Sequence, residues 1–562
     1  MQHDLSDPCW TIVAHFLPRA DRFALLALCR SVVHSPLRRA FFAESTWRVP
    51  PVEWLATKVV ETLTMKASIR AVRIEETWQQ AYLAELPVVT HVESRCGGES
   101  GASLLSWLPL NLKSLSLYRA ELSVEELAAL PNLTTLTLRF CTVARPNALT
   151  VLSRVAQLSL LYVRHQNDEW VASLPNLRVL RVEGTPFNPA SLLLLDQLEE
   201  LHLRGSDIEG LADLTVVSPR LKVLGLNDSH VELLADDDEA VVEVDQFFAG
   251  LTQIESLNLE ATHFLNDKLA PLTRLTTLSV LHLNDMFSDL GPLASLSNLE
   301  VLTICAIKDA YWSPIRKLKK LHTLNMNQHF DVENLSALRA IHDLPELRSL
   351  KNPPRLSARY PLRLLHELEV YTLSPYSLAF DPGCCLNLTK LTVVGGFDLG
   401  SLVASFPKLK SLNLNYLRFC EDYRPLARLL DLEGLAMGGR PQISIQHGFN
   451  FLERLTRLIS LDLSGTPIEK LSVVGNMKNL QRLVLDGTPI KDLSALADLP
   501  SLREVSCMGC NNLRLVSSVR SRSGLGKCCI PAEVDCSSLV CTNSISYLHF
   551  RLLIHGAAVD CV

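Results

Sequence analysis

The stretch LDLSGTPI, residues 461–468, is followed by a near copy, LVLDGTPI, at residues 483–490. The two copies start 22 residues apart. A single helix or strand needs no such repetition, whereas a stack of equal structural units does. The pair therefore indicates that this part of the chain is built from repeated units.

The two copies belong to a longer series with the template L-x-x-L-x-L-x-x-(T/S/C)-x-(I/V/F). Most units start 21 to 24 residues after the preceding one; the exceptions are one step of 33 residues, two of 26 and one of 18. This is the period of leucine-rich repeats. The first apolar position of each unit falls at Leu112, Leu133, Val155, Leu177, Leu198, Leu221, Ile254, Leu278, Leu299, Leu321, Leu347, Leu365, Leu388, Leu409, Leu432, Leu458, Leu480 and Leu502.

The spacing within one unit predicts where its side chains point. Alternate residues of a strand face the same side, so Leu461 and Leu463 are predicted to face inward and Asp462 outward. Ile468 and Leu471 then close the same interior from the opposite wall. One unit cannot bury these side chains by itself, but its neighbours can, with their strands paired as a parallel sheet.

A tight bend is predicted after each strand, where the sequence often reads Gly-Thr-Pro, as at Gly465–Pro467. Glycine permits the bend and proline fixes the direction in which the chain leaves it. The hydroxyl in the middle can hydrogen-bond buried backbone groups. Thr or Ser dominates this position, and Cys141 takes it in one unit.

With these repeats the chain resembles the leucine-rich-repeat family over roughly residues 110–515, in about eighteen units. The resemblance implies an α/β fold, a leucine-rich-repeat solenoid shaped as a horseshoe with a parallel β-sheet on its concave face. We expect a small helical module at residues 1–50, degenerate starting repeats at 51–110, the repeats themselves at 111–515 and an irregular Ser- and Cys-rich tail at 516–562.

Composition limits the classes of partner and the compartment. The chain has 562 residues, 48% of them hydrophobic and 20% charged, so it can bury a large apolar surface. A net charge of −6 disfavours nucleic acid and anionic membranes as partners, since both select basic surfaces. No apolar run is long enough to span a membrane, and the N-terminus lacks a secretory signal pattern. The 15 scattered cysteines favour reduced thiols and a cytoplasmic protein, with the nucleus as the alternative.

No group of residues in the sequence predicts catalysis, a bound metal ion or a cofactor. Cys507 and Cys510 have the CxxC spacing of half a zinc site, but Cys528 and Cys529 lack the spacer that the other half requires. We therefore interpret the CxxC pair as small buried apolar residues. The acidic run Asp236–Glu239 lacks the alternate spacing and the glycine of a calcium loop and is predicted to be a solvated loop.

The surface expected to bind a partner consists of outward positions on the strands of the first repeats. Arginine and aromatic side chains gather there, which is the composition of binding hot spots. Because solenoids offer an extended concave surface for binding, we expect a protein partner on this face. The candidate contact residues are Tyr118, Arg119, Arg139, Phe140, Tyr162, Arg181, His202 and Arg204.

The segment at residues 7–47 carries apolar residues at helical spacing and is predicted to form three short helices, the first ended by Pro18 and the second capped by Asp21. It resembles an F-box, the small helical module that docks on an adaptor of cullin-type ubiquitin ligases. The alternative is a helical cap over the apolar end of the solenoid. The F-box resemblance implies adaptor contacts by Pro8, Ile12, Leu17, Pro18, Leu25 and Leu28.

The sequence favours a non-enzymatic protein-binding protein, and in the more specific form an adaptor that recruits substrates to a cullin-type ubiquitin ligase. The first alternative is a leucine-rich-repeat scaffold, or a regulatory subunit related to a phosphatase or to signalling, with no link to a ligase. The second alternative is an enzyme, either a GTPase-activating solenoid or a ligase with a catalytic cysteine such as Cys528.

Overall fold

The chain forms two compact units that meet in sequence between Ala310 and Tyr311. The structure is a computed structural model. It describes residues 46–48, 71–74, 89–94, 108–123, 127, 130–144, 152, 154–165, 171, 174–185, 192, 195–205, 207–209, 220–232, 237–262, 269–326, 334–371, 380–417, 420, 422–439, 448–513 and 527–529.

The first unit is a stack of parallel strands in which each repeat contributes one strand to a long sheet. Equivalent positions of successive repeats lie opposite one another, so Leu136 pairs with Leu115 on one side and with Leu158 on the other. The strands of this sheet are β1 (Thr46–Arg48), β2 (Ala71–Ile74), β3 (His91–Ser94), β4 (Ser114–Tyr118), β6 (Thr135–Arg139), β8 (Gln157–Leu161), β10 (Val179–Glu183), β11 (Glu200–Arg204), β13 (Val223–Gly225), β15 (Ser256–Asn258), β16 (Val280–Asp289) and β17 (Val301–Tyr311).

The second unit repeats the same arrangement. Each of its strands pairs in parallel with the next, and Leu461 lies between Leu435 and Leu483. The strands are β18 (Thr323–Asn325), β19 (Ser349–Lys351), β20 (Glu367–Tyr371), β21 (Lys390–Gly395), β22 (Ser411–Leu417), β23 (Gly434–Ala436), β24 (Ser460–Asp462), β25 (Arg482–Val484), β26 (Glu504–Ser506) and β27 (Lys527–Cys529).

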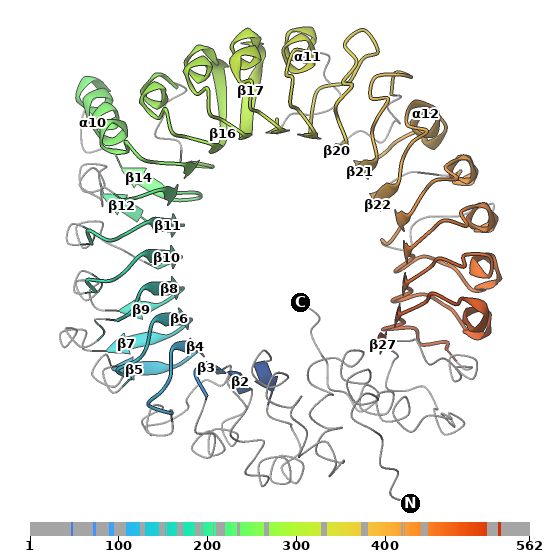
Figure 1. The fold of residues 1–562 in the computed structure, drawn as a ribbon, viewed down its shortest axis with the longest axis horizontal. Coiled ribbons are helices and arrows are strands. Elements are labelled where there is room, and N and C mark those ends of the chain that lie inside the picture. The colour runs from blue at the N-terminus through green and yellow to red at the C-terminus, as the bar shows by residue number, and fades with distance from the viewer. Residues whose placement is uncertain are drawn as a thin grey trace, which may run out of the picture. The chain divides into compact units, whose positions relative to one another are not determined.

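Helices and short strands complete the repeats. In each unit the strands of the long sheet follow the inner side of the curve and the helices follow its outer side (Figure 1). Two small sheets accompany the first unit: β5 (Glu121–Ser123), β7 (Thr142–Ala144) and β9 (Arg164–His165) form one, and β12 (Asp207–Glu209) and β14 (His230–Glu232) form the other. The helices are α10 (Asp237–Gly250), η4 (Ala270–Arg274), η5 (Gly291–Ser295), η6 (Ser313–Lys317), α11 (Leu335–His342), α12 (Leu399–Ser405), η7 (Arg424–Arg428), η8 (Asn450–Arg454), η9 (Ser472–Val474) and η10 (Ser494–Asp498).

The core lies between the sheet and the outer wall and is made of the residues that the template predicted. All eighteen first apolar positions are buried, and none is more than 4% exposed. Leu461 and Leu463 face the interior, and Ile468 and Leu471 cover it from the other wall. The predicted fold class is confirmed: the chain is a leucine-rich-repeat solenoid with a parallel sheet.

The hydroxyl of the bend after the strand is buried and hydrogen-bonded, as predicted. Thr466 Oγ1 donates to the carbonyl of Leu463 at 2.7 Å, and Thr488 Oγ1 donates to that of Leu485 at 2.6 Å. Cys141 takes the same role, since its thiol donates to the carbonyl of Arg139 at 3.4 Å. Each of these carbonyls also accepts a backbone N–H, so the side chain in the bend adds a second buried hydrogen bond to the same acceptor.

The prediction of a solvated loop at the acidic run was wrong for most of its residues. Helix α10 begins at Asp237, so Asp237, Asp238 and Glu239 belong to its first turn. Acidic residues are favourable there because the first turn of a helix presents unpaired N–H groups and the positive end of the helix dipole. The spacing of the acidic residues excludes a calcium loop but is equally compatible with the start of a helix.

Four strands fall in the parts of the chain predicted to be least regular. β1 lies within residues 1–50 and pairs in parallel with β2, and β2 pairs in parallel with β3; both β2 and β3 lie in the predicted starting repeats. β27 lies in the predicted tail and pairs in parallel with β26. The long sheet therefore extends at both ends beyond the repeats that the template located.

Candidate protein-binding surface

The residue that directly follows each of the strands β4, β6, β8, β10 and β11 has a backbone conformation in the left-handed region. The φ angles are 53° at Arg119, 54° at Phe140 and 54° at Tyr162, followed by 54° at Gly184 and 60° at Gly205. This conformation costs a residue with a side chain about 1–2 kcal/mol, whereas glycine adopts it freely. Three consecutive repeats therefore place a large side chain where glycine would be the unstrained choice.

The second unit shows how the same bend is made without strain. Gly465, Gly487 and Gly509 take the equivalent position, with φ of 67°, 66° and 68°. The use of Arg119, Phe140 and Tyr162 is therefore not required by the repeat itself. Residues held in a sparsely populated backbone region persist when the surrounding structure fixes them, and they gather at functional sites.

Aromatic side chains of three successive repeats stack on one another beside these bends. The rings of Tyr118 and Phe140 meet edge to face with centroids 5.5 Å apart, and the rings of Phe140 and Tyr162 are parallel with centroids 5.1 Å apart. Phe140 is 49% exposed and Tyr162 47% exposed. The half-buried Tyr118 and the exposed Phe140 and Tyr162 form a continuous surface, which we call the aromatic ladder.

The structure places the candidate residues in two positions of the repeat. Tyr118 and Arg139 are the last residues of β4 and β6 and pair with each other in the sheet. Arg119, Phe140 and Tyr162 lie one residue past the ends of β4, β6 and β8, on the bends that follow the strands. The aromatic ladder therefore runs across the strands along one edge of the sheet.

Two arginines flank the aromatic ladder. The guanidinium of Arg119 lies over the ring of Tyr118, 5.1 Å from its centroid, which is a cation–π contact. The side chain of Arg139 is exposed. Within the part of the chain that the structure describes, neither arginine has a carboxylate within ion-pair distance.

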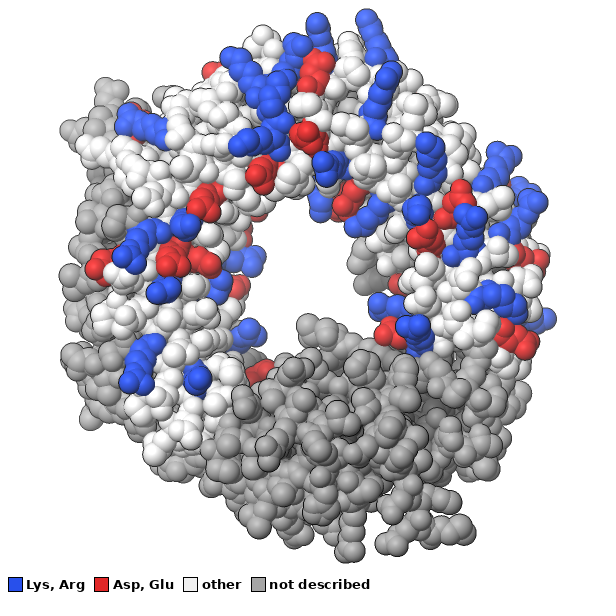
Figure 2. Space-filling view, in the orientation of Figure 1, with Lys and Arg blue, Asp and Glu red and all other residues white. Residues whose placement is uncertain are grey.

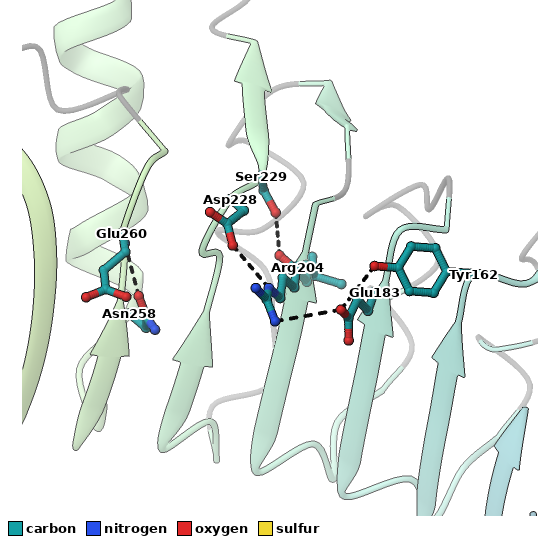
Figure 3. A network of polar contacts seen from close by, with 8 residues as sticks. Tyr162, Glu183, Arg204, Asp228, Ser229, Asn258 and Glu260 are labelled. Carbon is teal, nitrogen blue, oxygen red and sulfur yellow. Dashed lines mark hydrogen bonds and ion pairs between the residues drawn. The ribbon is translucent and has the colours of Figure 1, made fainter. Parts of the chain in front are cut away.

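The repeats that follow the aromatic ladder carry a network of charged side chains that pair with one another. The hydroxyl of Tyr162 donates to Glu183 Oε1 at 3.3 Å, and Arg204 forms an ion pair with the same oxygen at 3.7 Å (Figure 3). Arg204 Nε also donates to Asp228 Oδ2 at 3.0 Å. These carboxylates, with the tyrosine hydroxyl as a further partner, raise the pKa of Arg204. The network neutralises this cation and anchors the last ring of the aromatic ladder.

Arg181 and His202 lie side by side on β10 and β11, as their register requires. Arg181 pairs with Glu200 at 3.0 Å. Burial lowers the pKa of His202, and the nearby charge of Arg181 lowers it further, while Glu200 opposes both. Gly225 leaves room for the imidazole, because a Cβ there would lie 2.9 Å from His202 Nδ1.

The structure tests some of the remaining predicted sites. The F-box-like residues Pro8 to Leu28 lie outside the residues that the structure describes. Cys507 and Cys510 are both buried, and the thiol of Cys510 donates to the carbonyl of Leu485 at 2.9 Å, which confirms their interpretation as core residues. Within the described ranges, no three His, Cys, Asp or Glu side chains gather closely enough to hold a metal ion.

Sequence reasoning missed the acidic partners of the network and the role of Gly184. Glu183, Asp228 and Glu200 each stand one repeat from the arginine that they contact. The repeat register could have located Glu183, which lies opposite Arg204 in the sheet. The stacking of the rings depends on side-chain rotamers, and the register gives no indication of these.

No family model matches this sequence, and no curated protein matches it. Solved structures similar to it include an internalin from Listeria monocytogenes, at 22% identity, with 63% of this chain and 87% of that chain covered and a TM-score of 0.31. A leucine-rich-repeat protein of Leptospira interrogans is 18% identical, with 77% and 99% covered and a TM-score of 0.35. The plant peptide hormone receptor RGFR1, in complex with RGF2, is 13% identical, with 89% and 88% covered and a TM-score of 0.32.

None of the helices in the described ranges has both the length and the apolar character needed to cross a membrane.

Proposed function

We propose that this chain is a non-enzymatic protein-binding scaffold and that a protein partner docks on the aromatic ladder and its flanking arginines. The observation on which the proposal rests is the use of Arg119, Phe140 and Tyr162 in left-handed bends that glycine makes without strain. The fold does not gain stability from these choices, because a bend of this kind disfavours any side chain. A contact surface gains from them, since they project large side chains from a rigid edge.

The composition and rigidity of the aromatic ladder support this assignment. Tyrosine and arginine are the residues that most often dominate the energy of protein–protein contacts. Aromatic side chains with few rotatable bonds lose little conformational entropy on binding. Stacking between Phe140 and Tyr162 and the hydrogen bond to Glu183 hold the rings in place before a partner arrives, which lowers the entropic cost of association.

Affinity purification of the full-length chain from cell extract, followed by mass spectrometry, tests the proposal. The double variant Phe140→Ala/Tyr162→Ala should lose at least one protein that the wild type captures. Tyr371→Ala is the matched control, because Tyr371 is also an exposed aromatic residue on a strand end, in the second unit. If both variants capture the same proteins as the wild type, the aromatic ladder is not the contact surface.

The finer proposal is that residues 7–47 connect this scaffold to a cullin-type ubiquitin ligase as an F-box does. Its support is the resemblance of the sequence, with Pro8 at the start, Leu17 and Pro18 at the end of the first predicted helix, and Leu25 and Leu28 in the following apolar run. In this case the aromatic ladder selects the protein to be ubiquitinated. The alternative is a scaffold or regulatory subunit whose N-terminal segment only caps the solenoid.

Co-purification separates these two forms of the proposal. The full-length chain should bring down a ligase adaptor and a cullin, and Leu17→Asp/Leu25→Asp should lose both while it keeps the partner of the aromatic ladder. Capture of a phosphatase or a kinase without a cullin favours the regulatory alternative. The cytoplasmic or nuclear location proposed from the cysteine content can be checked in the same cells by imaging the tagged chain.

A further inference from the structure

We infer that the occupant of the aromatic ladder is an extended acidic segment of a partner protein, one that places an apolar side chain on the ring of Phe140 and carboxylates beside Arg119 and Arg139. This inference rests on the proposed function, because it names the chemistry of the partner that the scaffold binds. The observation that supports the inference is the distribution of charged side chains along one edge of the sheet in the first unit.

Along that edge, ion pairing changes from one repeat to the next. Arg204 is held by Glu183 and Asp228, and Arg181 by Glu200, all through contacts within the chain. Arg119 and Arg139 stand two to four strands away, and no carboxylate of the described residues lies within ion-pair distance of either. Figure 2 shows basic and acidic side chains together over β10 and β11, whereas basic side chains over the earlier repeats stand in a mainly uncharged surface.

The uncharged surface beside these arginines is formed by hydroxyl side chains on the strands. Ser114 and Ser116 of β4 face outward, as do Thr135 and Thr137 of β6 and Ser159 of β8. Such side chains can accept or donate hydrogen bonds to an extended backbone without adding charge. Arginine binds carboxylates through two parallel hydrogen bonds, so the guanidinium groups provide the charge recognition.

The dimensions suit a short extended segment. The two steps between ring centroids are 5.5 Å and 5.1 Å. Since an extended chain advances about 3.3 Å per residue, the aromatic ladder spans about three to four residues. Alternate side chains of such a segment fall on the same side, so an apolar residue on Phe140 is compatible with acidic neighbours that reach Arg119 and Arg139.

Charge complementarity favours a protein segment over a nucleic acid. On the repeats that follow, Glu183, Glu200 and Asp228 pair with Arg181 and Arg204, so these arginines are already neutralised and offer little attraction to a phosphate backbone that extended past the aromatic ladder. The chain as a whole carries a net charge of −6. A nucleic-acid surface needs a continuous basic track, and this edge is basic over only two repeats.

Fluorescence anisotropy with the full-length chain tests the inference. The probes are a fluorescein-labelled peptide that alternates Glu and Asp with Phe and Leu, and a neutral twin with Gln and Asn in place of the acids. A labelled single-stranded oligothymidine serves as the nucleic-acid probe. The acidic peptide should bind at least about tenfold more tightly than its twin, and its affinity should fall as salt is raised.

Charge reversal assigns the binding to the two arginines. Arg119→Glu/Arg139→Glu should lose the preference for the acidic peptide. Arg454→Glu/Arg503→Glu makes the same change of net charge at exposed positions of the second unit and should keep it. A circular dichroism spectrum and a thermal unfolding curve for each variant confirm that the solenoid is intact.

Three results would overturn the inference: no binding of the acidic peptide, equal binding of the two twins, or tighter binding of the oligothymidine. Each of these can occur while Phe140→Ala/Tyr162→Ala still loses a captured protein, in which case the proposed function stands and only the acidic chemistry of the partner is wrong. If the capture does not depend on the aromatic ladder at all, the proposed function fails first.

Discussion

The ring of Tyr162 lies directly against the backbone of Gly184 in the next repeat. A Cβ atom at Gly184 would be 2.4 Å from Cε1 and 2.6 Å from Cδ1 of that ring. Glycine is therefore favoured at this bend by its φ of 54° and required by the space that the ring occupies. The aromatic ladder ends where the repeats return to glycine.

Gly184→Ala should destabilise the chain more than Gly205→Ala does. Both substitutions place a side chain in a left-handed bend, at about 1–2 kcal/mol. At Gly205 the new Cβ would meet only the backbone N of Gly184, at 3.9 Å. At Gly184 it would displace the ring of Tyr162 from Phe140 and from Glu183. Thermal unfolding of both variants measures the difference.

The same comparison in a Tyr162→Ala background provides the control. Once the ring is absent, both glycine variants should lose similar stability, because only the backbone cost remains. If Gly184→Ala stays the more damaging change in that background, the contact with Tyr162 is not its cause.

Arg119→Gly should leave the solenoid at least as stable as the wild type and should weaken binding of the partner. The substitution relieves a left-handed bend with a φ of 53° and removes only a cation–π contact on the surface. Arg119→Ala removes the same contact but keeps the bend strained, so it should be less stable than Arg119→Gly by about 1 kcal/mol. Chemical denaturation measures this difference, and equal stability of the two variants would show that the bend is not strained.

Thr466→Val should destabilise the chain by about 1 kcal/mol, although valine has nearly the same volume. The hydroxyl of Thr466 is buried and donates to the carbonyl of Leu463 at 2.7 Å. Without it, the carbonyl of Leu463 keeps only the hydrogen bond from the backbone N–H of Thr466 at 3.1 Å, so the chain loses the net contribution of one buried hydrogen bond. Thr456→Val is the control, because Thr456 is exposed in the same unit. Similar unfolding midpoints for the two variants would contradict a role for the hydroxyl.

The stability of the chain should decrease as the pH falls from about 7 to 5, in part because of two histidines. Burial lowers the pKa values of His202 and His282 below the ordinary value of 6.5. The unfolded chain then binds protons that the folded chain does not, so the stabilising contribution is present above pH 6.5 and is lost below it. Thermal unfolding across this range measures the effect.

His202→Gln/His282→Gln should lose less stability over that pH range than the wild type does. His366→Gln serves as the control, because His366 is exposed in the second unit. The explanation fails if the double variant and the wild type lose the same amount.

The sequence predicted the core far better than it predicted the surface. All eighteen first positions of the template are buried, and so are the hydroxyls of Thr466 and Thr488. The first apolar position repeats in every unit with the same neighbours, so an error in one unit would have broken the series. The buried hydroxyl recurs in several units, among them those of Thr185 and Thr262. The start of α10 was missed because it lies in the longest interval between two units, where the template gives no information.

The candidate surface was predicted by residue type but not by arrangement. The sequence indicated that Tyr118, Phe140 and Tyr162 project from neighbouring repeats. It did not indicate that they stack, that Phe140 and Tyr162 lie in left-handed bends, or that Tyr162 is anchored by Glu183. Nor did it distinguish Arg204, which is paired within the chain, from Arg139.

The sequence by itself determined the solenoid, because a fixed period makes each inward leucine meet the same position of the adjoining repeat, and burial of apolar surface then selects one register. Only the tertiary structure decided which surface groups remain available to a partner. Ion pairs and ring contacts on a surface depend on rotamers and on distances of a few ångströms between different repeats, and no periodicity in the chain encodes them.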